Sequence, residues 1–296
     1  MEREGERAVA RTARRELGEE WALVLLAEDL TPALHRSQGR WVVCVPEEQA
    51  EQALRILASY ARESCPAPPA RSKAWSGEAP VAFGLAVAGS LLLFHRIMET
   101  SARAGAWLEQ GAASARAIRE GELWRTVTAL TLHADAAHVL GNALAGGLMW
   151  TLVGRALGPG LGALAILAAG AGGNLANALL RPGPHESVGA STAVFAAVGL
   201  LGGFGGARPA PGVRRLPGWM MGAACLGLLA MLGTGGARTD IWAHGFGLAV
   251  GLAVGAGLGR LLPGPPALGG QLLCGGLAAG GVVGCWWLAS LAGAGG

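Results

Sequence analysis

Seven stretches of this chain contain no Asp, Glu, Lys or Arg over roughly the length that a membrane-spanning helix needs. They are residues 81–95, 136–154, 156–180, 187–207, 216–237, 241–259 and 261–296. A helix crosses about 30 Å of hydrocarbon with about 17 to 25 residues, and the first stretch is at the short end. Three prolines open the last stretch, so its helix is expected to begin near Leu268. The sequence predicts an all-α polytopic membrane protein with seven spans.

Composition supports a membrane protein over a soluble one. Of 296 residues, 52% are hydrophobic, 15% are charged and 50 are glycine. The glycines lie inside the apolar stretches, as in membrane helices that pack closely through small residues. The net charge of +3 comes without a basic stripe carrying aromatics, so no nucleic-acid partner is expected. The five cysteines form no C-x-x-C pair, and we interpret them as reduced structural residues.

Residues 1–72 differ from the rest and are expected to form a small soluble α/β module with its linker. Residues 11–28 have helical spacing, and Trp41–Val45 is typical of a short strand. A second helix is expected to open at Pro46, followed by acidic residues that suit a helix N-terminus. The proline-rich residues 65–69 are typical of a linker.

The loops predict that the N-terminus is cytoplasmic. The roughly 75 residues before the first apolar stretch are rich in charge and contain no early apolar run, which argues against a cleavable signal peptide. With the module inside, Arg155, the loop of residues 208–215 and Arg260 also lie on the cytoplasmic side. The basic residues of the long loop 97–130 then lie outside and weaken this count. We expect the C-terminus on the outer side.

Ser191 lies near the start of the charge-free stretch 187–207, where it should occupy the first turn of a helix that starts below the membrane surface. First-turn N–H groups have no helical partner, and the helix N-terminus favours negative charge. Ser191 could therefore act as a nucleophile whose own backbone N–H stabilises an oxyanion. Gly189 would leave room for a substrate carbonyl. A lone serine in such a position could instead cap the helix or fill a helix contact.

His244 is expected near the outer end of its own span, at a depth similar to that of Ser191. Gly247 and Gly251 follow it on the same helix face and would let a neighbouring backbone approach closely. There it could take the proton of Ser191 as a general base and return it to a leaving amine. By itself, His244 could also be a structural hydrogen-bonding residue.

His138 and Asn142 stand four residues apart and share one helix face. Both side chains can donate hydrogen bonds to an oxyanion. His133 lies off that face and is expected at the junction of loop and helix, packing the long loop. The pair could alternatively be polar groups that hold two helices together.

Metal and aspartyl chemistry find less support than serine chemistry. No His-Glu-x-x-His occurs, and the spacing of His133 and His138 suits a single metal poorly. Asp135 and Asp240 are expected near helix ends and are not paired in mid-membrane. We therefore expect no metal and no cofactor.

Taken together, these residues give the chain a resemblance to the rhomboid intramembrane serine proteases over roughly residues 80–260. The matching positions are His133, His138 and Asn142, then Trp124-Arg125 in the preceding loop, Gly189-Ala-Ser191, and the helix with Ala243, His244, Gly247 and Gly251. The resemblance implies a six-helix core over residues 79–260, with 261–296 as an additional C-terminal transmembrane helix and 1–72 as an accessory module.

The resemblance also implies an activity and a setting. It implies a serine endopeptidase that cleaves transmembrane-helix substrates in the lipid bilayer, with a Ser191–His244 dyad, no third acid, and Asn142, His138 and backbone N–H groups as the oxyanion hole. A bacterial cell membrane, with the active site opening toward the outer face, is the expected location. The chain departs from the family at Thr192, where many members have glycine, which puts efficiency and substrate range in question.

Two alternatives remain. A non-proteolytic rhomboid-like protein would bind membrane helices without cleaving them, but such proteins lose the serine or the histidine. A transporter or channel would show inverted repeats with interrupted helices, and the sequence has no such symmetry.

Overall fold

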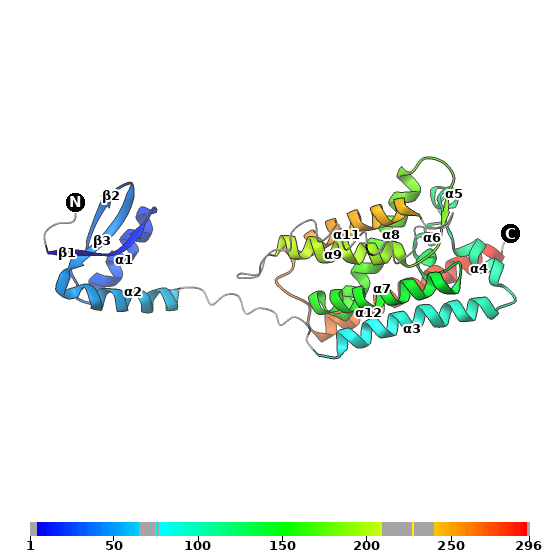
Figure 1. Ribbon diagram of the computed structural model, residues 1–296, viewed down its shortest axis with the longest axis horizontal. Helices are drawn as coiled ribbons and strands as arrows, with labels where there is room; N and C mark the ends of the chain where they lie inside the picture. The colour runs from blue at the N-terminus through cyan, green and yellow to red at the C-terminus, as the bar shows by residue number, and fades with distance from the viewer. Residues whose placement is uncertain (1–4, 65–74, 76, 209–226, 228–239, 295–296) are drawn as a thin grey trace. The chain divides into compact units, whose positions relative to one another are not determined.

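The computed structural model describes residues 5–64, 75, 77–208, 227 and 240–294. The chain divides into two compact units, residues 1–71 and 72–296 (Figure 1). The predicted span over residues 216–237, the proline-rich stretch 65–69 and most of the loop 208–215 lie outside the described residues.

The N-terminal unit packs two helices on a three-stranded antiparallel sheet of order β1-β3-β2. Its elements are β1 (Glu6–Thr12), α1 (Arg15–Ala27), β2 (Ala33–Ser37), β3 (Arg40–Pro46), a short 3-10 turn η1 (Glu47–Gln49) and α2 (Ala50–Ser64). Val43 and Val45 of the central strand form a core with Leu25 and Ala53 of the two helices.

The expected helix over residues 11–28 is wrong at its N-terminal end. The helix begins at Arg15, because Arg11 and Thr12 pair with the central strand as part of β1. Strand β1 is an edge strand with charged residues, so its sequence does not show the alternation of apolar and polar residues that is typical of a strand. The predicted strand at Trp41–Val45 and the helix after Pro46 are both confirmed.

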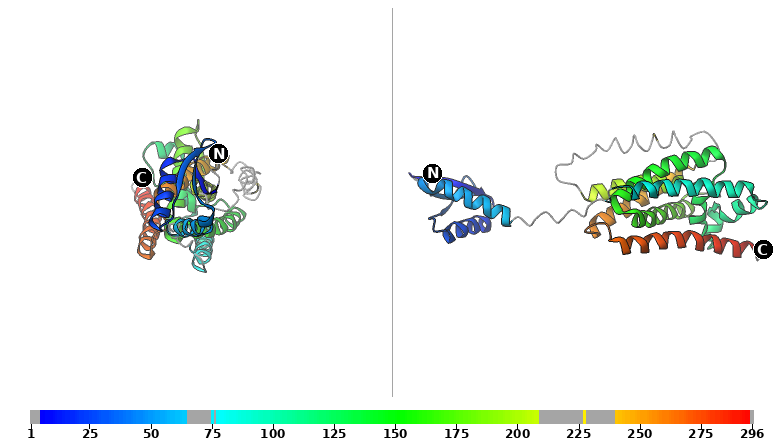
Figure 2. Two further views of the ribbon diagram at one scale, coloured as in Figure 1. Left: turned by 90° about the vertical axis from the view of Figure 1, so that its left-hand side faces the viewer. Right: turned by 90° about the horizontal axis from the view of Figure 1, so that it is seen from below.

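The second unit consists mainly of long apolar helices that lie side by side in two views (Figure 2). They are α3 (Ala79–Thr100), α7 (Ala136–Leu157), α8 (Pro159–Leu180), α9 (Ser191–Ala207), α11 (Ile241–Leu261) and α12 (Leu268–Ala294). All except α9, which has 17 residues, are long and apolar enough to cross a membrane. The predicted start at Leu268 is confirmed. Leu85, Leu144 and Leu272 are exposed on these helices, as expected for side chains that contact lipid.

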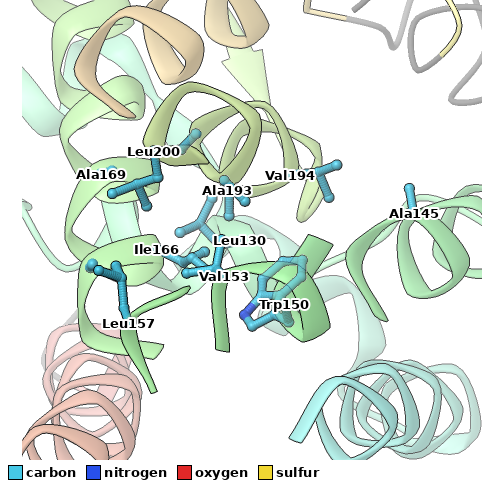
Figure 3. Packing of buried hydrophobic residues seen from close by; sticks show 13 residues of the cluster. Leu130, Ala145, Trp150, Val153, Leu157, Ile166, Ala169, Ala193, Val194 and Leu200 are labelled. Atoms are coloured by element: carbon cyan, nitrogen blue, oxygen red, sulfur yellow. The ribbon is translucent and has the colours of Figure 1, made fainter. Parts of the chain in front are cut away.

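The core of this unit lies where α7, α8 and α9 meet (Figure 3). Trp150 and Val153 of α7 pack with Ile166 of α8 and with Val194 of α9. Leu130, which precedes α7, closes the same cluster. Helix α9 is therefore surrounded by neighbours over most of its length, and its first residue is held in the interior of the unit.

Helices α9 and α11 pack against each other at very short range. A Cβ atom at Gly251 would collide with the carbonyl oxygen of Ala196, and one at Gly255 with that of Leu200. In return, Gly199 and Gly203 of α9 face the backbone of α11 just as closely. The predicted glycine face is thus confirmed, and it brings the two backbones into direct contact.

The long loop between α3 and α7 is folded, where the sequence indicated only a loop. It contains α4 (Ala104–Gly111), β4 (Ala113–Ser114), α5 (Ala115–Arg119), α6 (Arg125–Thr128) and the 3-10 turn η2 (Ala129–Thr131). Strand β4 pairs with β5 (Glu186–Ser187). This pairing ties the loop to the segment that leads into α9.

Candidate active site

Ser191 and His244 meet at the ends of the tightly packed pair α9 and α11. The Oγ atom of Ser191 lies 2.8 Å from Nε2 of His244, although 53 residues separate them in the chain. Ser191 is the first residue of α9, and His244 stands in the first turn of α11. Both are buried, with 7% and 4% of their surfaces exposed. The contact places the Ser191 hydroxyl within hydrogen-bonding distance of an imidazole nitrogen, and both side chains are largely removed from solvent.

An aromatic ring, not an acid, supports the imidazole of His244. Phe195 stacks on it, with ring centroids 4.6 Å apart and planes inclined by 12°. The Nδ1 atom of His244 is buried and has no hydrogen-bond partner among the described residues. Phe195 follows Ser191 by four residues, so both face α11 from the same side of α9. Phe195 was not among the predicted site residues, although its spacing of four residues from Ser191 places it on the same helix face.

The start of α11 is fixed by Asp240, which the sequence analysis placed near a helix end without a role. Its Oδ1 accepts a hydrogen bond from the backbone N–H of Ala243, as an N-cap does, and pairs with Arg181 at 2.9 Å. Its Oδ2 accepts a hydrogen bond from Asn177 at 2.7 Å. These partners lie at the end of α8 and just beyond it, so Asp240 anchors the helix of His244 to α8.

The segment before Ser191 is held by backbone hydrogen bonds. The N–H of Gly189 donates to the carbonyl of Ala129 at 2.9 Å, and the N–H of Ala190 donates to Nε2 of His133 at 3.3 Å. Burial lowers the pKa of His133 to about 3, so its imidazole is neutral and can accept this bond. His133 lies at the predicted junction between loop and helix, but it contacts the segment leading to Ser191, which was not foreseen.

Gly189 provides the space beside the serine. Its φ of 129° is one that side chains rarely adopt. A Cβ atom there would lie 2.7 Å from Cε1 and 2.8 Å from Nε2 of His138, and 3.6 Å from Oγ of Ser191. The absence of a side chain at residue 189 therefore keeps open the gap between the His138 ring and the Ser191 hydroxyl.

Asn142 is fully buried one helical turn after His138. Its Nδ2 donates to the carbonyl of His138 in its own helix at 3.0 Å, and its Oδ1 has no hydrogen-bond partner among the described residues. Within the described part of the chain, the Asn142 amide therefore does not hold a neighbouring helix. One N–H of that amide is left to bind another group.

Trp124 and Arg125 lie in the folded loop and not beside Ser191. The guanidinium of Arg125 binds Glu122 and also donates to the carbonyls of Glu109 and Ala112, at 2.6 and 3.1 Å. Arg125 thus joins the end of α4 to the start of α6. The Nε1 atom of Trp124 is buried without a hydrogen-bond partner among the described residues.

Thr192 fits into a space made by two glycines of neighbouring helices. Its Cγ2 would lie 3.1 Å from a Cβ at Gly247 of α11 and 2.9 Å from one at Gly173 of α8. Gly247 thus makes room for the Thr192 side chain, whereas Gly251 faces Ala196 one turn further along α9.

Comparison with known proteins assigns this arrangement to a family. Residues 120–261, which include every residue of the candidate site, match the model of the Rhomboid domain. The chain is a rhomboid family protein. It is 41% identical over 91 residues to "Rhomboid protease GluP" of Bacillus subtilis strain 168, a match that covers 31% of this chain and 18% of that relative. The chain therefore aligns with less than a fifth of the relative's length. Its apolar helices make it a multi-pass membrane protein.

Proposed function

We propose that this rhomboid family protein is an intramembrane serine endopeptidase that cleaves peptide bonds in or near the transmembrane helices of other proteins. The observation that carries the proposal is the 2.8 Å contact between Ser191 Oγ and His244 Nε2 in a buried site within apolar helices. A buried serine in contact with a base is the arrangement that nucleophilic acyl transfer requires. The name of the Bacillus relative supports the same activity.

The chemistry proceeds in two halves. His244 Nε2 takes the Ser191 proton while Oγ forms a bond to the substrate carbonyl carbon, and the carbonyl π electrons move to its oxygen. The tetrahedral intermediate collapses, the C–N bond breaks, and the proton passes from His244 to the leaving amine. A water molecule then attacks the acyl-enzyme with His244 again as base. The carboxylic acid leaves and Ser191 regains its proton.

The neutral imidazole needs no carboxylate to work in this site. Stacking on Phe195 limits rotation of the His244 ring and directs Nε2 toward Ser191. Asp240 affects His244 only indirectly, because it caps the helix that carries His244 and binds that helix to α8. The dyad therefore relies on helix packing for its geometry.

Three donors serve the oxyanion in this proposal. The backbone N–H of Ser191 points from the first turn of α9, where the helix N-terminus favours negative charge. The His138 ring lies across the gap over Gly189. Asn142 has one amide N–H beyond the one that binds its own helix.

The activity is tested with a fluorescent transmembrane-helix reporter in liposomes. Ser191→Ala and His244→Ala are each expected to abolish cleavage, and the double variant is expected to add no further loss, because the two residues act as one unit. Ser90→Ala on the exposed side of α3 and His185→Ala in an exposed loop are matched controls that should cleave normally. Wild-type protein that binds the reporter without cleaving it would favour the helix-binding alternative.

A further inference from the structure

Three potential metal ligands lie together in the N-terminal unit, whereas the residues of the candidate active site all belong to the second unit. They are Glu6 on β1, His35 on β2 and Cys44 on β3, one from each strand of the sheet. One ligand atom from each side chain lies within 4.8 Å of the other two. We propose that these three side chains bind a zinc ion. The proposal does not depend on the proposed protease activity.

The strand register brings the three side chains to one face of the sheet. Cys44 pairs with Ala8 on one side and with Ala33 on the other. Because side chains alternate between faces, Glu6 and His35, each two residues from those alanines, share the face of Cys44. The alanines are too short to cover the sulfur. Glu6 and His35 reach it from the diagonal positions, and Cys44 is fully buried.

The opposite face carries the hydrophobic core, so the cluster is not part of it. Val43 and Val45, the neighbours of Cys44 along the strand, point to the helices α1 and α2. The cluster instead gathers a thiol, an imidazole and a carboxylate on the second face of the sheet. Burying such polar side chains away from water costs free energy unless their charges are compensated.

The distances fit a tetrahedral zinc ion. The Cys44 Sγ atom lies 3.6 Å from Nε2 of His35. With Zn–S near 2.3 Å and Zn–N near 2.0–2.1 Å, two ligands at the tetrahedral angle lie about 3.6 Å apart. The carboxylate of Glu6 would have to move by on the order of 1 Å to complete the site. Its Oε2 atom is buried and has no hydrogen-bond partner among the described residues, which leaves it available.

The ligand types select the metal. A thiolate, an imidazole and a carboxylate suit zinc, whereas magnesium and calcium prefer oxygen ligands alone. A thiolate and a carboxylate together carry two negative charges, which one Zn²⁺ ion neutralises. Three protein ligands leave a fourth position for water or an external ligand. We had expected no metal in this chain, because it contains no His-Glu-x-x-His motif and the spacing of His133 and His138 suits a metal poorly. Glu6, His35 and Cys44 are widely spaced in the sequence and match no metal motif, so that expectation did not take them into account.

The test uses cobalt as a spectroscopic probe for zinc in the full-length protein, purified in detergent and treated with a chelator. Addition of Co²⁺ is expected to give a thiolate-to-cobalt charge-transfer band with one ion bound per chain. Zn²⁺ should displace the cobalt and abolish the band, and excess Mg²⁺ should leave it unchanged. If wild-type protein gives no such band, the Cys44–His35 contact is a thiol–imidazole hydrogen bond and the proposal is overturned.

Variants then assign the band to these residues. Cys44→Ser should abolish it. His35→Gln and Glu6→Gln, at less buried positions, should weaken binding by at least the roughly 10–100-fold that the loss of an outer-shell group costs. Cys274→Ser in α12 and Glu16→Gln in α1 are matched controls that should bind as wild type does. Retention of the band in Cys44→Ser would overturn the assignment. So would a cobalt affinity equal to that of wild type in His35→Gln and Glu6→Gln, if both variants have normal circular dichroism.

Discussion

Replacement of Phe195 by leucine tests whether ring stacking orients the catalytic base in the proposed mechanism. Phe195 is buried and lies flat against His244 at a centroid distance of 4.6 Å. Leucine retains much of the apolar volume, and swaps of this kind usually cost less than about 1.5 kcal/mol of stability. An aromatic pair contributes about 0.5–1.5 kcal/mol beyond its buried area, so its loss should lower kcat by about 2- to 13-fold.

The assay is cleavage of a transmembrane reporter in liposomes, with kcat and KM determined separately. We expect the loss in kcat, with KM little changed, because Phe195 contacts the base. Phe195→Tyr retains the ring and should restore most of kcat. Phe204→Leu, on the same helix and packed against the core, is the control and should retain wild-type kcat. An unchanged kcat in Phe195→Leu, or an equal loss in Phe204→Leu, would show that stacking on Phe195 does not orient the His244 ring.

Three further predictions concern the groups around the dyad. Asn142→Ala should lower kcat by about 10²–10³-fold with little change in reporter binding; weaker binding at unchanged kcat would make Asn142 a docking residue. Thr192→Val should remain active because the methyl group fills the space at Gly247, and Thr192→Gly should cost up to about 1 kcal/mol of stability and widen the substrate range; a folded but inactive Val variant would assign a role to the hydroxyl. Asp240→Ala should lower both thermal stability and kcat, whereas Asp240→Asn, which retains the cap, should recover most of kcat. Equal losses in the two variants would show that the ion pair between the Asp240 carboxylate and Arg181 matters more than the cap.

The parts of the fold that could be predicted are those governed by local rules. Charge-free stretches located the long helices, and the three prolines gave the start of α12 at Leu268. The position of Ser191 in the first turn of its helix and the glycine face of α11 also followed from sequence. In each case the signal lies within one segment, where hydropathy or spacing is enough.

The features that could not be predicted depend on contacts between distant segments. Phe195 matters only because α11 brings His244 onto its ring, and Asp240 gains its role from Arg181 beyond the end of α8. The helices of the loop 97–130 have too few apolar residues to stand out, and they become ordered through partners such as the β4–β5 pair. The cluster around Cys44 requires the register of three strands, and only the strand of Cys44 itself was predicted from the sequence.

The central claim is that Ser191 is a nucleophile activated by His244. It is tested most directly by labelling the protein in membranes with a fluorescent serine-directed phosphonate and locating the adduct by mass spectrometry. We expect one adduct, on Ser191, that forms in wild-type protein and in Ser90→Ala but is lost in Ser191→Ala and strongly reduced in folded His244→Ala. Failure of folded, wild-type protein to form the adduct on Ser191, or labelling of Ser191 at the same rate without His244, would contradict it.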